Sequence, residues 1–137
     1  MASIRKEILL EAPPHEVWDV VRDVGAVHRR FAPGFVTDTQ LDAGARVVTF
    51  ANGLVVRELI VDVDESSRRL AYAAVGGRLA HHNASFTVIG DGERTRLVWV
   101  ADLLPNELAP VIDGMMEQGA EAIRRALSPA LQHDTHL

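Results

Sequence analysis

The stretch Thr95-Arg-Leu-Val-Trp-Val-Ala-Asp-Leu103, followed after Leu104-Pro105 by a helical pattern from Asn106 to Leu127, decides the fold of this chain. The first part reads as a strand with two distinct faces, and the second has an apolar stripe at helical spacing. Most of the chain before it has strand patterns. A single long helix among many strands is buried when a curved antiparallel sheet wraps around it. The pattern therefore predicts an α+β fold with a cavity between sheet and helix.

Two short helical segments precede the main run of strands. The first strand is expected at Ser3–Glu11, where Lys6 interrupts an apolar face. Pro13 and Pro14 end it, and the apolar spacing that follows predicts a short helix to about Asp23, since proline suits a first helical turn. A second helical turn is expected at Gly25–Phe31.

The middle of the chain alternates strands and turns. Asn52-Gly53 is its strongest hairpin signal, and Gly90-Asp91-Gly92 predicts the last hairpin. The strands expected before 95–103 are 35–41, 45–51, 54–63, 70–75 and 81–89.

Length and composition bound the possibilities. The 137 residues predict one domain, 1–127, with a frayed tail at 128–137. The absence of cysteine excludes disulfides and thiolate chemistry. The N-terminus lacks the apolar core of a signal peptide and no apolar run is long enough to span a membrane, so we expect a cytoplasmic protein. We expect it to be a monomer or a weak homodimer.

Several partner classes are disfavoured. The net charge of -5 does not indicate the basic surface that would bind the phosphate backbone of nucleic acid. His81 and His82 are adjacent on a strand and point to opposite faces, while His133 and His136 have no third ligand nearby, so we expect no metal site. The glycine-rich turns lack the helix that would hold a phosphate, and we expect no cofactor.

The order of elements and several short phrases resemble the SRPBCC superfamily, whose fold START domains and the major birch pollen allergen share. Within it the chain is similar to bacterial polyketide cyclase/dehydrase and lipid-transport-like proteins. The match covers roughly residues 3–127. The phrases are Ala12-Pro13-Pro14-His-Glu-Val17-Trp18, Gly44-Ala-Arg46 before Gly53, Val56-Arg-Glu58, Asp64 before Leu70-Ala-Tyr72, and Thr95-Arg-Leu-Val-Trp99.

This resemblance implies a helix-grip fold. A curved antiparallel sheet of seven strands would wrap around the long C-terminal helix, in the order first, seventh, sixth, fifth, fourth, third, second. Two short helices between the first and second strands would close one end. The fold hosts carriers, receptors and enzymes, so it implies no activity by itself.

Alternation along the strands places most side chains, but strand 54–63 is ambiguous. Its more apolar parity includes Arg57, and a strict two-residue turn would pair Phe50 with Val55. The resembling family has a carboxylate in its pocket wall at this point, which favours Glu58 inward, with a bulge restoring the parity.

With that choice, Arg46, Glu58, Tyr72 and His82 form a polar line in an apolar pocket. A buried Arg46–Glu58 pair either orients a polar group of a ligand or is a structural ion pair. His82 beside Tyr72 is the candidate catalytic pair, a general acid or base for ring closure or dehydration. Alternatively His82 is only a hydrogen-bonded wall residue.

The predicted function is binding of a small, mainly hydrophobic polyketide, aromatic or lipid-like ligand. The alternatives are a cofactor-independent cyclase, aromatase or dehydratase, and a ligand-gated interaction protein. The candidate ligand-binding residues are Phe31, Phe35, Arg46, Val48, Phe50, Val56, Glu58, Ile60, Tyr72, His82, Ala84, Phe86, Trp99, Ala101, Ile112, Met115, Met116 and Gly119. Met115, Met116 and Gly119 interrupt the helix stripe with flexible or small residues, which predicts room for a guest there.

Overall fold

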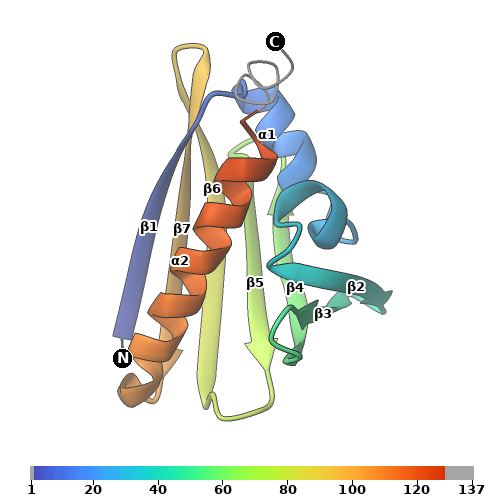
Figure 1. Cartoon of the computed structure of the whole chain (residues 1–137), viewed down its shortest axis with the longest axis vertical. Helices are drawn as coiled ribbons and strands as arrows, with labels where there is room; N and C mark the ends of the chain where they lie inside the picture. Colours follow the sequence, from blue (N-terminus) through green and yellow to red (C-terminus); the bar gives the residue numbers. More distant parts are fainter. Residues whose placement is uncertain (1, 129–137) are drawn as a thin grey trace.

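Seven strands form one curved antiparallel sheet in the computed structural model, which describes residues 2–128 (Figure 1). The strand order is β1-β7-β6-β5-β4-β3-β2, which confirms the predicted topology. The first and last strands are therefore neighbours. The strands are β1 (Ala2–Leu10), β2 (Val36–Asp42), β3 (Ala45–Phe50), β4 (Val55–Asp64), β5 (Arg69–Val75), β6 (His81–Asp91) and β7 (Arg94–Leu104).

The helical segments lie where the sequence predicts them. They are α1 (Pro14–Val21), the π-helical turn η1 (Val27–Phe31), the 3-10 turn η2 (Asn106–Leu108) and α2 (Ala109–Ala126). The sequence pattern from Asn106 leaves the start of the regular helix open, and the structure places it at Ala109, with Pro110, which has no backbone N–H to donate, in the first turn.

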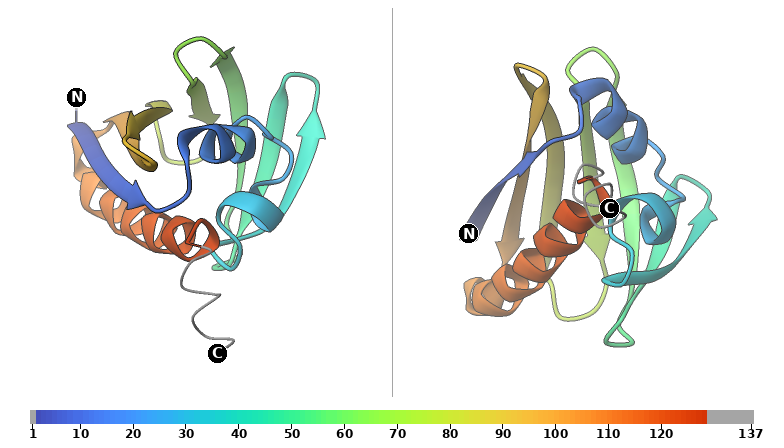
Figure 2. Two further views of the ribbon diagram at one scale, coloured as in Figure 1. Left: turned by 90° about the horizontal axis from the view of Figure 1, so that it is seen from above. Right: turned by 45° about the horizontal axis from the view of Figure 1, so that its top comes forward.

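The long helix α2 lies across the concave face of the sheet, and α1 and η1 cover one end (Figures 1 and 2). The side chains of Met116 and Ile123 on α2 are buried. Lys6 on β1 contacts the carboxylates of Asp113 and Glu117 on α2, at 2.6 Å from Glu117 Oε1. Hydrogen bonds to these two carboxylates raise the pKa of Lys6. The charged residue that interrupts the apolar face of β1 thus ties the helix to the sheet.

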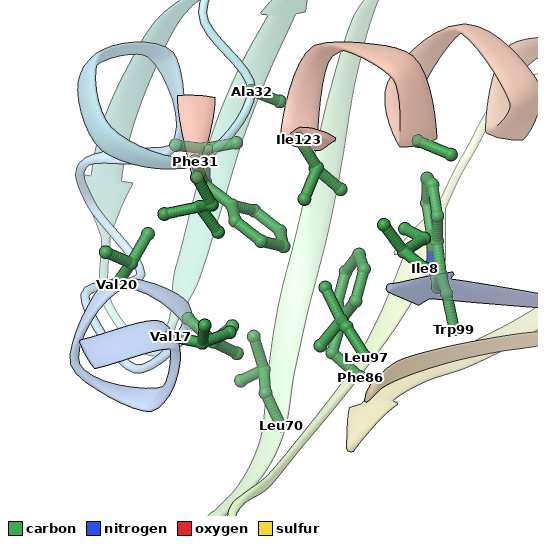
Figure 3. Close-up of a cluster of buried hydrophobic side chains, with 14 of the residues drawn as sticks. Ile8, Val17, Val20, Phe31, Ala32, Leu70, Phe86, Leu97, Trp99 and Ile123 are labelled. Carbon is green, nitrogen blue, oxygen red and sulfur yellow. The ribbon is translucent and has the colours of Figure 1, made fainter. Parts of the chain in front are cut away.

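The end of the sheet beneath α1 and η1 is filled by a packed core. Figure 3 shows side chains from both segments, the strands and α2 pointing toward one another. The rings of Phe31 and Phe86 meet edge to face with centroids 5.0 Å apart, and Phe86 stacks on Trp99 at 4.7 Å. Such pairs add stabilisation beyond the burial of apolar area. This end leaves little room for a ligand.

Gly119 allows α2 to approach the sheet closely. A Cβ at this position would lie 3.0 Å from both Phe35 Cε2 and Trp99 Cη2. Aromatic rings therefore occupy the space that the small residue leaves. The room that the sequence predicts at Gly119 is thus largely taken by these rings, and what remains is a small chamber that Gly119 lines.

The turn before β4 decides which of its side chains face inward. The connection is not a strict two-residue turn: Phe50 N–H donates to Leu54 O at 2.8 Å, and Gly53 has a φ of 89°. A three-residue turn with a left-handed glycine shifts the pairing by one residue. Thr49 consequently lies opposite Val55, and Arg46 lies opposite Glu58. The prediction that Glu58 faces inward is confirmed.

Two further expectations from the sequence concern membrane spans and the C-terminal tail. No helix within the described residues is long and apolar enough to span a membrane. From residue 129 onward, the expected tail at 128–137 lies outside the described residues, as do His133 and His136.

Candidate ligand cavity

A cavity of about 120 Å³ lies between the sheet and the N-terminal half of α2. We call it the inner cavity. Its wall is mainly apolar, and the polar side chains in it come from β4, β5, β6 and β7. The lining residues are Phe35, Phe50, Leu54, Val56, Glu58, Tyr72, Ala74, Leu79, His82, Trp99, Ala101, Ile112, Met115 and Met116.

Two further spaces adjoin the inner cavity. A deep chamber of about 60 Å³ lies toward η1 and shares Phe35, Phe50, Glu58, Tyr72 and Trp99 with it. On the other side lies a vestibule of about 300 Å³, formed by the start of β4, the end of β5 with the connection that follows it, and the start of α2. Val55, Val75 and Val111 in its wall are exposed to solvent. The vestibule shares with the inner cavity Leu54, Val56, Ala74, Leu79, Ile112 and Met115.

Most of the predicted pocket residues line these spaces. The deep chamber adds five that do not line the inner cavity, namely Phe31, Arg46, Val48, Phe86 and Gly119. Ile60 and Ala84 line neither space, which corrects the prediction for these two. Ile60 precedes a bulge in β4 and packs against the core, and the methyl group of Ala84 lies beside the larger ring of Tyr72.

Sequence reasoning missed three residues that line the inner cavity. Ala74 has the inward parity of β5, and that signal was available from the sequence alone. Leu54 and Leu79 lie in the connections, where no strand or helix period assigns a direction to a side chain. Both connections bring leucines over the mouth of the cavity.

Arg46 and Glu58 form a buried ion pair on neighbouring strands. Arg46 Nε donates to Glu58 Oε1 at 2.8 Å, and the side chains are 4% and 11% exposed. Arg46 also donates to the carbonyl of Val24, and its guanidinium carbon lies 5.2 Å from the Tyr72 ring centroid. Among residues 2–128 no donor bonds Glu58 Oε2. The pair is internally neutralised and leaves one carboxylate oxygen for a ligand.

Tyr72 keeps its proton in this environment. Trp99 Nε1 donates to Tyr72 Oη at 3.0 Å. Burial, followed by the nearby charge of Glu58, raises the pKa of Tyr72 well above its ordinary value. Because the oxygen already accepts from Trp99, the phenolic O–H remains available as a donor.

The hydrogen bonds of His82 define its tautomer. The backbone N–H of Ala74 donates to His82 Nδ1 at 3.1 Å, so Nδ1 is an acceptor and the proton of the neutral ring lies on Nε2. Burial, and then the charge of His81, lowers the pKa of His82, which favours this neutral form. His82 therefore offers an N–H donor. Of the two roles that the sequence suggested for His82, this tautomer fits a general acid at Nε2 and not a general base, because that nitrogen already carries a proton.

The described residues hold no group of three or more His, Asp or Glu side chains that could bind a metal ion.

Three side chains supply the polar chemistry of the inner cavity. Tyr72 and His82 are neutral donors, and Glu58 is an acceptor. Such a set suits an uncharged molecule with one polar edge.

A curved sheet of seven antiparallel strands that wraps around a C-terminal helix is the helix-grip fold. Solved structures agree. A START superfamily protein from Mycobacterium smegmatis has a TM-score of 0.72 and 12% identity, covering 96% of this chain and 97% of that chain. By its sequence the chain belongs to the polyketide cyclase/dehydrase and lipid transport family, whose family model matches residues 1–132.

Two other solved structures are similar to the chain. A norcoclaurine synthase point mutant from Thalictrum flavum, in complex with a transition-state analogue, has a TM-score of 0.70 and 19% identity, covering 97% of this chain and 96% of that chain. A Thermobifida fusca protein solved by NMR has a TM-score of 0.71 and 27% identity, covering 93% and 97%. No curated protein matches the chain. At 12% and 19% identity, the likeness shows a shared fold alone.

Proposed function

We propose that this protein binds a small, mainly apolar ring compound in the inner cavity. The observation that carries the proposal is an apolar space with three convergent polar groups, the usual composition of a small-molecule site. An engineered apolar cavity of about 150 Å³ holds benzene, so a space of about 120 Å³ suits one ring. Substituents or an attached chain would extend into the vestibule. The family and the fold support this class of function.

Neighbouring alanines on β5 allow a matched test. Ala74 lines the inner cavity, whereas Ala73 lies on the opposite face of the strand, opposite Leu59. Ala74→Leu should fill the cavity and weaken binding of a ring-sized probe such as 3-ethylphenol by about ten-fold or more, because the ring then lacks space. Ala73→Leu adds the same bulk outside and should leave the affinity unchanged.

Titration calorimetry on both folded variants measures this difference, and native mass spectrometry of the purified protein identifies any retained molecule. Equal affinities of the probe for the two leucine variants would contradict binding in the inner cavity.

A second candidate function is cofactor-free proton transfer, favoured by the free Glu58 Oε2 beside two neutral donors. In that reaction Glu58 takes the proton next to a ligand carbonyl, and the electron pair moves to the carbonyl oxygen. Hydrogen bonds from Tyr72 and His82 stabilise the resulting enolate. If a β-hydroxyl then leaves as water, it departs with the proton held by Glu58. Ring closure or dehydration of a polyketide-like compound is chemistry of this class.

Deuterium uptake from D₂O into an enolisable cyclic ketone, followed by NMR, separates this enzyme from a passive binder. Glu58→Gln should lower the exchange rate by about 100-fold, as expected for loss of a general base. Asp62→Asn, which changes an exposed carboxylate of the same strand, should leave the rate unchanged. Exchange no faster than in buffer for the wild-type protein would eliminate this candidate.

A further inference from the structure

Glu58 and His82 face each other across a gap whose floor is Ala74. Glu58 pairs with Ala74 between β4 and β5. Between β5 and β6, Tyr72 pairs with Ala84, so the same register extended by two residues places Ala74 opposite His82. The hydrogen bond from the Ala74 N–H to His82 Nδ1 confirms that these two residues lie close together. Adjacent strands lie about 4.8 Å apart, so the backbones carrying Glu58 and His82 are separated by roughly 10 Å. On β5, the residue between them is Ala74, whose side chain is a methyl group.

The two walls of this gap have complementary hydrogen-bonding capacity. On the β4 side, Glu58 Oε2 can only accept while Glu58 is ionised in its pair with Arg46. On the β6 side, His82 Nε2–H can only donate while Nδ1 accepts from the backbone. The O–H of Tyr72, one inward position along β5 from Ala74, adds a second donor.

We propose that this gap selects uncharged ring compounds that carry both a hydroxyl and a carbonyl group, and that it rejects carboxylates. The inference rests on the proposed function, since it names the ligand chemistry of the same cavity. The hydroxyl donates to Glu58, and the carbonyl accepts from His82 and Tyr72. The ring lies over Ala74 against the apolar wall of Ile112 and Met115.

Rejection of carboxylates inside the gap follows from the state of Arg46, which is paired with Glu58, whereas Arg78 lies on the exposed wall of the vestibule. The Arg46 guanidinium already contacts Glu58, the carbonyl of Val24 and the face of the Tyr72 ring. A ligand carboxylate would meet Glu58 Oε2, which can only accept hydrogen bonds, instead of a free cation. Like charges at close range in a buried site are strongly unfavourable.

A series of four probes tests the inference on the wild-type protein. The first probe, 3-hydroxyacetophenone, carries both the hydroxyl and the carbonyl group. In 3-methoxyacetophenone the hydroxyl donor is lost, in 3-ethylphenol the carbonyl is lost, and in 3-hydroxybenzoate a carboxylate replaces the acetyl group. Titration calorimetry should show about ten-fold or greater weakening for loss of the hydroxyl, because that bond involves a charged partner. Loss of the carbonyl should weaken binding several-fold, and 3-hydroxybenzoate should bind most weakly.

The variant His82→Leu assigns the carbonyl contact. Its affinities for 3-hydroxyacetophenone and 3-ethylphenol should differ less than those of the wild-type protein, because Tyr72 alone then donates to the carbonyl, and its retained binding of 3-ethylphenol shows that the cavity is intact. If His82→Leu does not fold, the wild-type ranking of the four probes decides alone. Equal affinities for the four probes, or tighter binding of 3-hydroxybenzoate, would overturn the inference and leave the proposed function standing. Failure of all four to bind would overturn both.

Discussion

Breaking the Arg46–Glu58 pair should destabilise the protein far more than removing both partners. The side chains are 4% and 11% exposed and meet at 2.8 Å, so either single substitution leaves a buried charge without its partner. Such a loss costs about 3–5 kcal/mol. Arg46→Met also removes the contact with the Tyr72 ring, which adds about 1 kcal/mol. We therefore expect Arg46→Met to lie near the upper end of that range and Glu58→Met near the lower end.

The double variant Arg46→Met/Glu58→Met should cost less than either single change, because apolar residues of similar volume often replace a buried pair with little loss. Urea unfolding followed by circular dichroism gives the four free energies of the cycle. The expected coupling between the two positions is about 3 kcal/mol or more. A lone buried carboxylic group can take up a proton, whereas a guanidinium cannot lose one. Arg46→Met should accordingly regain part of its stability at acidic pH, and Glu58→Met should not.

Single substitutions that each cost less than about 0.5 kcal/mol and add in the double variant would refute this reasoning, because changes at exposed sites behave in that way. Glu58 would then face solvent, and both proposals for the inner cavity would lose their acceptor.

Two further predictions concern α2 and His82. Gly119→Ala should destabilise by about 1–3 kcal/mol, because its Cβ meets Phe35 and Trp99 at 3.0 Å. In the same helix, a Cβ at position 114 would meet open space, so Gly114→Ala should stabilise the protein by up to about 1 kcal/mol. Thermal unfolding measures both variants, and equal effects of the two substitutions would contradict the close packing at Gly119. Burial lowers the pKa of His82, so the unfolded chain binds its proton first and stability should fall as pH drops below about 6.5. His82→Leu should flatten this part of the pH profile of unfolding free energy, and an unchanged slope would count against a buried neutral ring.

Most strands and the long helix could be predicted from the sequence because alternation and helical spacing extend over many residues, whereas the order of the strands in the sheet came from the family resemblance. It was harder to predict which side chains of β4 face the cavity. Asn52-Gly53 signals a hairpin but does not state its length, and the three-residue turn follows from the observed bond between Phe50 and Leu54. One added turn residue decides whether Glu58 or Arg57 faces the cavity. The family resemblance, rather than the residue pattern, gave the correct choice.

The chemistry of the cavity depends on contacts that no spacing reveals. The tautomer of His82 follows from a backbone N–H of Ala74 on the next strand, and the availability of the Tyr72 proton follows from Trp99 on β7. Strand alternation places these side chains inward but assigns them no donors or acceptors. The small space at Gly119 likewise depends on Phe35, which the sequence places in a distant segment.

The two tryptophans report on opposite regions of the molecule. Trp99 lines the inner cavity and donates to Tyr72, whereas Trp18 on α1 donates to Glu65 at 2.6 Å, away from the cavity. A ligand that enters changes the surroundings of the first indole and leaves those of the second unchanged. Trp18→Phe therefore gives a protein whose remaining intrinsic fluorescence comes from the cavity wall, so that binding can be followed by emission without an added dye.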